Sequence, residues 1–152
     1  MRDMAMLASP HQHDQKGNAM DKPEFFVTQG YGEKFHAKLG YSQAVKVGNR
    51  VEISGQGGWN DEIAFPESLV DEIELAFRNV ERVLAAAGAT WEHVISVVSY
   101  HVGGFPPETN ETFARLFRQY MPSHGPIWTE VGVAVLGDPR MRVEIQVTAI
   151  IA

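Results

Sequence analysis

Two carboxylates in the C-terminal part of the chain are the residues best suited to chemistry. Glu130 and Glu144 fall in two strands that we predict to be adjacent, and the side-chain alternation places both on one sheet face. Trp128 shares that predicted face, and a partly dry site beside an indole raises the pKa of a carboxyl group. Such a pair can exchange protons as general acid and base. Two alternatives stay open: Glu144 pairs with Arg140 or Arg142 at a subunit interface, or a neighbouring subunit supplies opposite charges to both carboxylates.

Other motifs predict no metal or cofactor site. Residues 55–58 form a glycine-rich run, but neither a lysine nor a predicted helix start follows it at once, so turn glycines explain it better than a phosphate loop. The histidines from position 36 onward lack metal-ligand spacing. His11 and His13 would need a third ligand, and a solvated tail is the favoured interpretation of that segment.

Composition and charge exclude several classes of function. Thirteen Lys and Arg against nineteen Asp and Glu give a net charge of −6, so we expect no nucleic-acid partner. The absence of cysteine rules out disulfides, thiolate metal sites and a cysteine nucleophile, and agrees with a reducing, cytoplasmic setting. Because no apolar run approaches the roughly 18 residues of a membrane helix, we expect no membrane partner.

The elements that must position these carboxylates begin with a hairpin and a helix. Ser42–Val47 and Val51–Ser54 are short β-rich runs, and Gly48-Asn49 between them suits a tight turn. Ser68 can cap a helix whose apolar residues recur every three or four positions until Gly88 ends it.

A strand, a second helix and two further strands complete the predicted order ββαβαββ. His93–Val102 is too rich in β-branched residues for a helix, and Glu108–Met121 carries a helical stripe that ends at Pro122. Ile127–Leu136 and Arg140–Ile151 are the last strands. This order predicts one α+β domain with a mixed sheet and two helices on one face, covering residues 21–152. Residues 1–20, which lack the apolar core of a signal peptide, are expected to form a disordered arm.

The sheet face that the helices leave open predicts an oligomer. In the last strand, the odd positions from 141 to 151 are apolar and form the core. The opposite face is expected to combine Trp128, Ala134 and Leu136 with Glu130 and Glu144. An apolar patch of this kind usually marks an interface, so we expect a homo-oligomer packed through that face.

Several motifs together resemble the Rid family, also called the YjgF/YER057c/UK114 family. They run from Gly40-Tyr41-Ser42-Gln43-Ala44-Val45 through Ser54-Gly55-Gln56 and Pro126 to Val143-Glu144-Ile145. The resemblance covers about Leu39 to Ile151. It implies a chorismate-mutase-like fold and a homotrimer with a small-molecule ligand cleft between subunits.

The resemblance also implies which residues line that cleft. Tyr41, Ser54, Gly55, Asn110 and Glu144 stand at its substrate-binding positions, and Glu144 matches the carboxylate that activates water. Family members hydrolyse enamines and imines and hold the substrate carboxylate with an arginine in a Pro-Ala-Arg motif. Here the motif reads Pro126-Ile127-Trp128, and the position two residues later, often a cysteine, is Glu130.

Three functions follow as hypotheses. The first is an enamine or imine deaminase, a hydrolase, acting on substrates other than simple 2-imino acids, since the carboxylate-binding arginine is replaced by an indole. The second is a ligand-binding or regulatory trimer without turnover. The third, an endoribonuclease or translation inhibitor, is disfavoured by the acidic charge.

Overall fold

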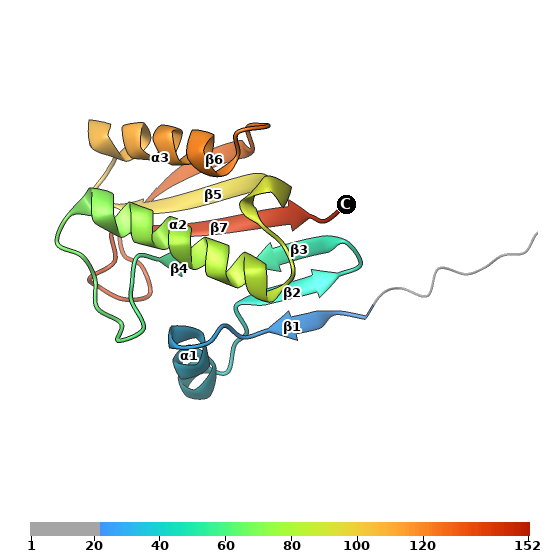
Figure 1. The fold of residues 1–152 in the computed structure, drawn as a ribbon. Helices are drawn as coiled ribbons and strands as arrows, with labels where there is room; N and C mark the ends of the chain where they lie inside the picture. The colour runs from blue at the N-terminus through green and yellow to red at the C-terminus, as the bar shows by residue number, and fades with distance from the viewer. Residues whose placement is uncertain (1–21) are drawn as a thin grey trace, which may run out of the picture.

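The computed structural model describes residues 22–152. The predicted arm at residues 1–20, with His11 and His13, lies outside this part. The described chain forms an α+β fold in which one mixed sheet packs against helices, which confirms the predicted fold class (Figure 1). Among these residues, no helix is both long and apolar enough to cross a membrane.

The sheet has seven strands, six of them in the order β1-β2-β3-β7-β5-β6, with β4 paired to β7 beside this row. Their bounds are Glu24–Phe26 (β1), Ala44–Val47 (β2), Arg50–Ile53 (β3), Gln56–Gly57 (β4), Val94–Val102 (β5), Ile127–Val133 (β6) and Val143–Ile150 (β7). Only β5 and β6 pair in parallel, so the sheet is mixed. The predicted hairpin is confirmed as β2 and β3.

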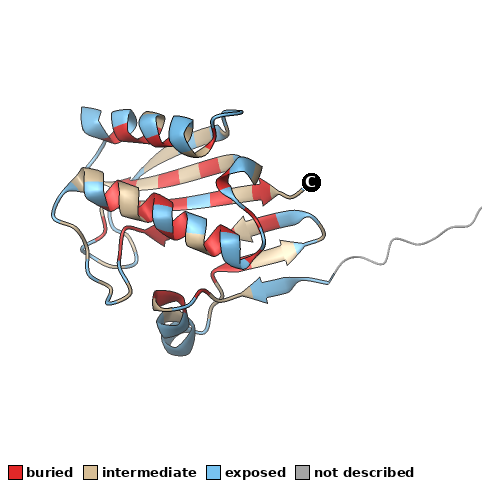
Figure 2. Cartoon of the chain, in the orientation of Figure 1, coloured by how far each residue is buried: buried red, intermediate tan, exposed pale blue. Residues whose placement is uncertain are grey.

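Helices α2 (Leu69–Ala86) and α3 (Pro107–Tyr120) cover one face of this sheet (Figure 1). As predicted, Ser68 caps α2 by accepting a hydrogen bond from the Asp71 N–H at 3.3 Å. Buried residues line the side of α2 that faces the sheet (Figure 2). The largest of them is Phe77, which stacks on Trp91 of the short 3₁₀ helix Trp91–His93.

A third helix, α1 (Tyr31–Leu39), was not predicted, and neither were the short strands β1 and β4. Glycines in the left-handed region bound α1, with φ 77° at Gly30 and φ 76° at Gly40. Tyr31 fixes it to the domain, since its hydroxyl donates to Gln56 Oε1 at 2.9 Å and its backbone N–H donates to Asp61 Oδ1 at 3.1 Å. Long-range contacts, rather than an apolar stripe, therefore place this helix.

The prediction that Trp128 and Glu130 of β6 lie on the open sheet face was wrong. Trp128 and Glu130 of β6 pair in register with Val97 and Ser99 of β5, whose side chains are buried on the helix-covered face. The Trp128 ring stacks on Phe113 of α3 at 5.1 Å. Consequently Trp128 and Glu130 lie beneath α3.

Glu144 lies on the opposite face from Glu130. It pairs in register with Tyr100 of β5 and Gly57 of β4, whereas its neighbours Val143 and Ile145 are buried under the helices. The strands β6 and β7 are also not adjacent, because β5 runs between them. One chain therefore cannot use Glu130 and Glu144 as a contacting pair.

Candidate functional site

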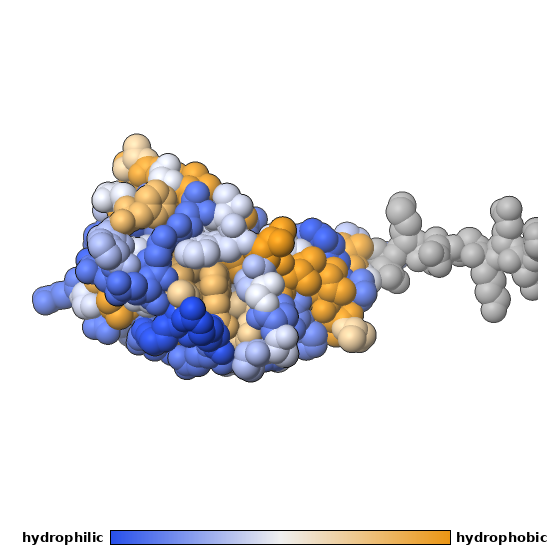
Figure 3. All heavy atoms as spheres, turned by 90° about the horizontal axis from the view of Figure 1, so that it is seen from above, coloured by the Kyte–Doolittle hydropathy of each residue, from blue (hydrophilic) through white to orange (hydrophobic). Residues whose placement is uncertain are grey.

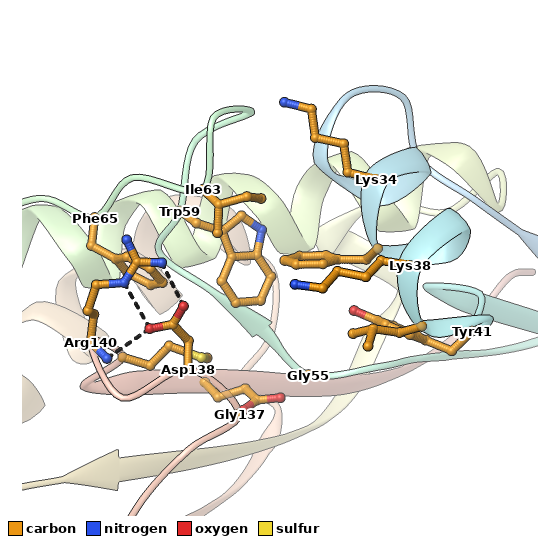
Figure 4. Close-up of a pocket in the computed structure, with 14 residues that line it drawn as sticks. Lys34, Lys38, Tyr41, Gly55, Trp59, Ile63, Phe65, Gly137, Asp138 and Arg140 are labelled. Atoms are coloured by element: carbon orange, nitrogen blue, oxygen red, sulfur yellow. Dashed lines mark hydrogen bonds and ion pairs between the residues drawn. The ribbon is translucent and has the colours of Figure 1, made fainter.

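A pocket of about 550 Å³ opens beside α1, on the side of the sheet that carries Glu144. Three segments enclose it: α1 with Tyr41, the loop that follows β4, and the loop that leads into β7 (Figure 4). Its volume is within the range of about 300–1,000 Å³ typical of small-molecule sites.

Aromatic side chains form the walls of this pocket. Phe35 of α1 packs edge-on against Trp59 at 5.2 Å and stacks with Tyr41 at 6.3 Å. Trp59 in turn packs edge-on against Phe65 at 6.2 Å. These contacts join α1 to the loop after β4, so the pocket is largely apolar on that side.

Glu144 supplies a carboxylate to the pocket lining, and Gly55 allows it to sit there. A Cβ at Gly55 would collide with Glu144 Oε1, so a larger residue here would displace the carboxylate from its present position. Burial raises the pKa of Glu144. Tyr41 lines the same pocket, and burial together with the charge of Glu144 raises the pKa of its hydroxyl.

Within residues 22–152, no arginine neutralises Glu144. Arg142 forms its ion pair with Glu72, at 2.6 Å from Nε to Oε2, and Arg140 pairs with Asp138, also at 2.6 Å. Within residues 22–152, no ion pair or hydrogen bond engages the Glu144 carboxylate. It is therefore a partly desolvated carboxylate that is free to exchange a proton.

The structure places the predicted site residues in two groups. Tyr41, Gly55 and Glu144 come together in the pocket. Ser54 lies next to Gly55, but its hydroxyl is engaged, donating to the Gln43 carbonyl at 3.3 Å and accepting from the Gln56 amide at 3.2 Å. Asn110 is an exposed residue of α3 itself, near Glu130, and belongs with Trp128 and Glu130 in the second group.

This second group is centred on a buried histidine. His101 is 2% exposed; its Nε2 lies 2.8 Å from Ser99 Oγ and 3.8 Å from Glu130 Oε1. The Trp128 indole N–H donates to the same Ser99 hydroxyl at 3.0 Å. Burial raises the pKa of Glu130, an effect that Asn110 opposes, and lowers the pKa of His101 to about 4.

His101 should make the domain sensitive to acid. Its pKa is about 4 when folded, against an ordinary value of 6.5, so the unfolded state binds more protons between these values and stability falls as the pH drops through this window. We expect a loss of about 2–3 kcal/mol between pH 7.5 and pH 4.5 from this group. Glu130 acts in the opposite sense, because a raised pKa favours proton uptake by the folded state.

Urea unfolding of the natural protein and of His101→Gln at the two pH values measures this contribution. The variant retains Glu130 and should lose less stability on acidification by that amount. Equal losses in the two proteins would contradict the prediction.

Sequence reasoning missed the residues that shape the pocket wall, namely Phe35, Lys38, Trp59, Ile63 and Phe65. They come from α1 and from the loop after β4, and no spacing pattern links these two segments. A concentration of aromatic and lysine residues between positions 34 and 41 was the available signal. Among residues 22–152, no group of three His, Cys, Asp or Glu side chains is arranged to hold a metal ion.

The chain is thus a small α+β protein with a pocket whose volume is typical of small-molecule sites. The family model described as Endoribonuclease L-PSP matches residues 32–151, so the chain belongs to this family, which confirms the Rid-family assignment. Two relatives of this chain are named as deaminases, which supports a deaminase-like function at the level of the family.

Individual relatives agree with this assignment. The 2-iminobutanoate/2-iminopropanoate deaminase of Dermatophagoides farinae is 35% identical over 117 residues, which is 73% of this chain and 85% of the relative. The RutC family protein YjgH of Escherichia coli (strain K12) is 32% identical over 102 residues, covering 66% and 76%. A solved structure of protein YjgH superposes with a TM-score of 0.72 at 29% identity, over 84% of this chain and 95% of that one.

Proposed function

We propose that this chain is an imine or enamine deaminase in which Glu144 acts as general base and general acid. The observation that carries the proposal is a half-buried carboxylate, without a partner among residues 22–152, in the lining of an aromatic pocket. Its raised pKa suits a group that must accept and return a proton near neutral pH. The deaminase-like relatives support the same chemistry.

The reaction needs one base that later acts as an acid. With the imine bound as its N-protonated iminium ion, Glu144 takes a proton from water as the water oxygen bonds to the C=N carbon. The C=N π electrons move onto the nitrogen, and a neutral carbinolamine forms. The resulting carboxylic acid then donates its proton to the amine nitrogen. The C–N bond breaks as the hydroxyl becomes a carbonyl, and the hydroxyl proton passes to Glu144 and then to the departing ammonia. One iminium ion and one water thus give one ketone or oxo acid and one ammonium ion.

We further propose that the working form is a homotrimer with the cleft at the subunit boundary. Glu144 and the group around Glu130 lie on opposite faces of one sheet, so they can share a cleft only across a boundary between chains. The sheet ends at β6, where Ile127 is 73% exposed, and Val135 just beyond it is 75% exposed. From above, the molecule shows apolar surface between hydrophilic areas (Figure 3).

The substrate is proposed to differ from the simplest 2-imino acids. Trp128 stands where the resemblance implies a carboxylate-binding arginine, and its ring is packed between Phe113 and Phe117. The indole provides no positive charge, and its only N–H is bonded to Ser99. A small imino acid that relies on that arginine should therefore bind weakly.

Ammonia release from freshly generated imines tests the proposed function. The protein, first shown by light scattering to be a trimer, is mixed with 2-iminobutanoate or with 2-imino-3-phenylpropanoate. We expect hydrolysis of the phenyl compound clearly above the uncatalysed rate, and hydrolysis of 2-iminobutanoate close to it. A trimer that accelerates neither reaction would instead be the non-catalytic ligand-binding protein of the alternative hypothesis, and a monomer would contradict the shared cleft.

A further inference from the structure

We infer that Lys38 is the anion-binding residue of the pocket, and that the ligand is a carboxylate carrying a flat aromatic or extended apolar group. The inference deepens the proposed function by naming the class of substrate. It rests on that function for the reaction at Glu144, whereas the binding itself can be measured without turnover.

Three cations stand around the pocket, and two of them are already engaged. The Lys34 ammonium donates to the Asp61 carbonyl oxygen at 2.5 Å, and its side chain points away from the pocket (Figure 4). Arg140 donates from Nε to Asp138 Oδ1 at 2.9 Å and from its Nη2 to Oδ2 at 2.6 Å. Its guanidinium also lies over the Phe65 ring, 4.9 Å from the ring centre.

Lys38 is the cation that remains. Its side chain extends into the pocket toward Trp59 (Figure 4). Within residues 22–152, no ion pair or hydrogen bond engages its ammonium. An anionic ligand group would pair with this ammonium, and such a charge-assisted hydrogen bond is stronger than one between neutral groups.

The neighbouring walls determine what else the ligand must carry. Phe35, Trp59 and Phe65 present ring edges and faces around the same space, and Ile63 and Met141 add apolar surface. A flat apolar group gains from such packing, whereas a four-carbon acid would leave most of the 550 Å³ unfilled. The combination therefore selects an aromatic or long-chain monoanion.

Lys38 also supplies a positive charge in place of the arginine that Trp128 replaces. A lysine on α1 lies on the Glu144 side of the sheet, whereas Trp128 lies under α3. The carboxylate would thus be held from the pocket wall rather than from β6. This accounts for a family member that lacks the arginine yet retains the pocket carboxylate.

Calorimetric titration with three stable probes tests the inference. They are 2-oxo-3-phenylpropanoate, which has both features, 2-oxobutanoate, which lacks the ring, and 4-phenylbutan-2-one, which lacks the charge. We expect the aromatic anion to bind best. Lys38→Gln should weaken its binding about tenfold or more and Lys38→Glu further, with little change for the neutral ketone.

Lys34→Gln is the matched control, because it removes the same charge from the same helix at a side chain that points away. It should change the dissociation constant of the aromatic anion less than twofold. Circular dichroism establishes that each variant is folded. Equal weakening by the two glutamine variants, or no preference for the aromatic anion, would overturn the inference.

The binding and turnover experiments test the two proposals independently. A protein that binds 2-oxo-3-phenylpropanoate through Lys38 but hydrolyses no imine would contradict the deaminase proposal and retain the inference. Conversely, hydrolysis that is unaffected by Lys38→Gln would retain the deaminase and reject Lys38 as the anion-binding residue.

Discussion

Replacing Arg142 with methionine is expected to lower the free energy of unfolding by about 3–5 kcal/mol, because it leaves a buried carboxylate without its partner. Glu72 is fully buried and accepts from Arg142 twice, from the backbone N–H at 2.8 Å and from Nε at 2.6 Å. The same guanidinium donates to the carbonyl oxygens of Pro66 and Glu67, each at 3.0 Å. The pair thus links α2, the turn before it and the start of β7, two residues from Glu144.

A surface ion pair between the same residue types provides the control. Arg115 and Glu74 pair across α3 and α2 with half and a third of their side chains exposed, so Arg115→Met should cost less than about 1 kcal/mol. Urea unfolding of both variants measures the difference. If Arg142→Met is no more damaging than Arg115→Met, the buried pair contributes little.

A double variant separates the loss of the ion pair from the loss of packing. Glu72→Met combined with Arg142→Met removes both charges, and apolar replacement of a buried ion pair is often neutral or stabilising. We therefore expect the double variant to recover much of the stability that Arg142→Met loses. A double variant as unstable as the single one would show that packing, not the unpaired charge, determines the effect.

The sequence predicted most of the fold because the main elements carry strong local signals. The Gly48-Asn49 turn, the Ser68 cap and the apolar stripe of α2 each specify their own structure without help from distant residues. Helix α1 has no such signal, since it has nine residues and depends on bonds from Tyr31 to Gln56 and Asp61. Short elements positioned by tertiary contacts are the ones that local patterns miss.

The face of β6 was assigned wrongly for a related reason. Both parities of this strand contain residues that avoid water, so alternation alone could not decide which side faces the helices. Pairing with β5 decides it, because Ser99 and His101 are polar yet buried under α3, where Trp128 bonds to the serine. A buried polar network of this kind depends on partners far apart in the chain.

The candidate site, like the fold, could be predicted only in part. The family resemblance singled out Tyr41, Gly55 and Glu144, and the structure brings these three together in one pocket. Lys38 and the aromatic wall were not predicted, because α1 and the loop after β4 are brought together by tertiary contacts. These include the hydrogen bond from the Tyr31 N–H to Asp61 and the packing of Phe35 against Trp59. The residues that would select the ligand are therefore those that the topology, not the motif, assembles.

Glu144→Gln is expected to lower the rate constant for imine hydrolysis by about 100-fold or more, which is the contribution of a positioned general base. The amide keeps the shape of the side chain beside Gly55 but cannot take a proton from water. The natural enzyme should also lose activity as the pH falls through the raised pKa of Glu144, because the base works in its ionised form. The variant should lack this limb of the pH profile.

Stability distinguishes this catalytic role from a structural one. Burial penalises the ionised form of Glu144, so above its pKa the charge costs the folded state stability, and the neutral amide removes that cost. Glu144→Gln should thus unfold at the same or a higher urea concentration at pH 7. Glu52→Gln is the control, since Glu52 is a carboxylate of β3 that already pairs with Arg50 and accepts from Thr148 at 2.6 Å, and it should leave hydrolysis unchanged. Hydrolysis that survives in Glu144→Gln, with its pH profile intact, would show that the pocket carboxylate does not move the proton.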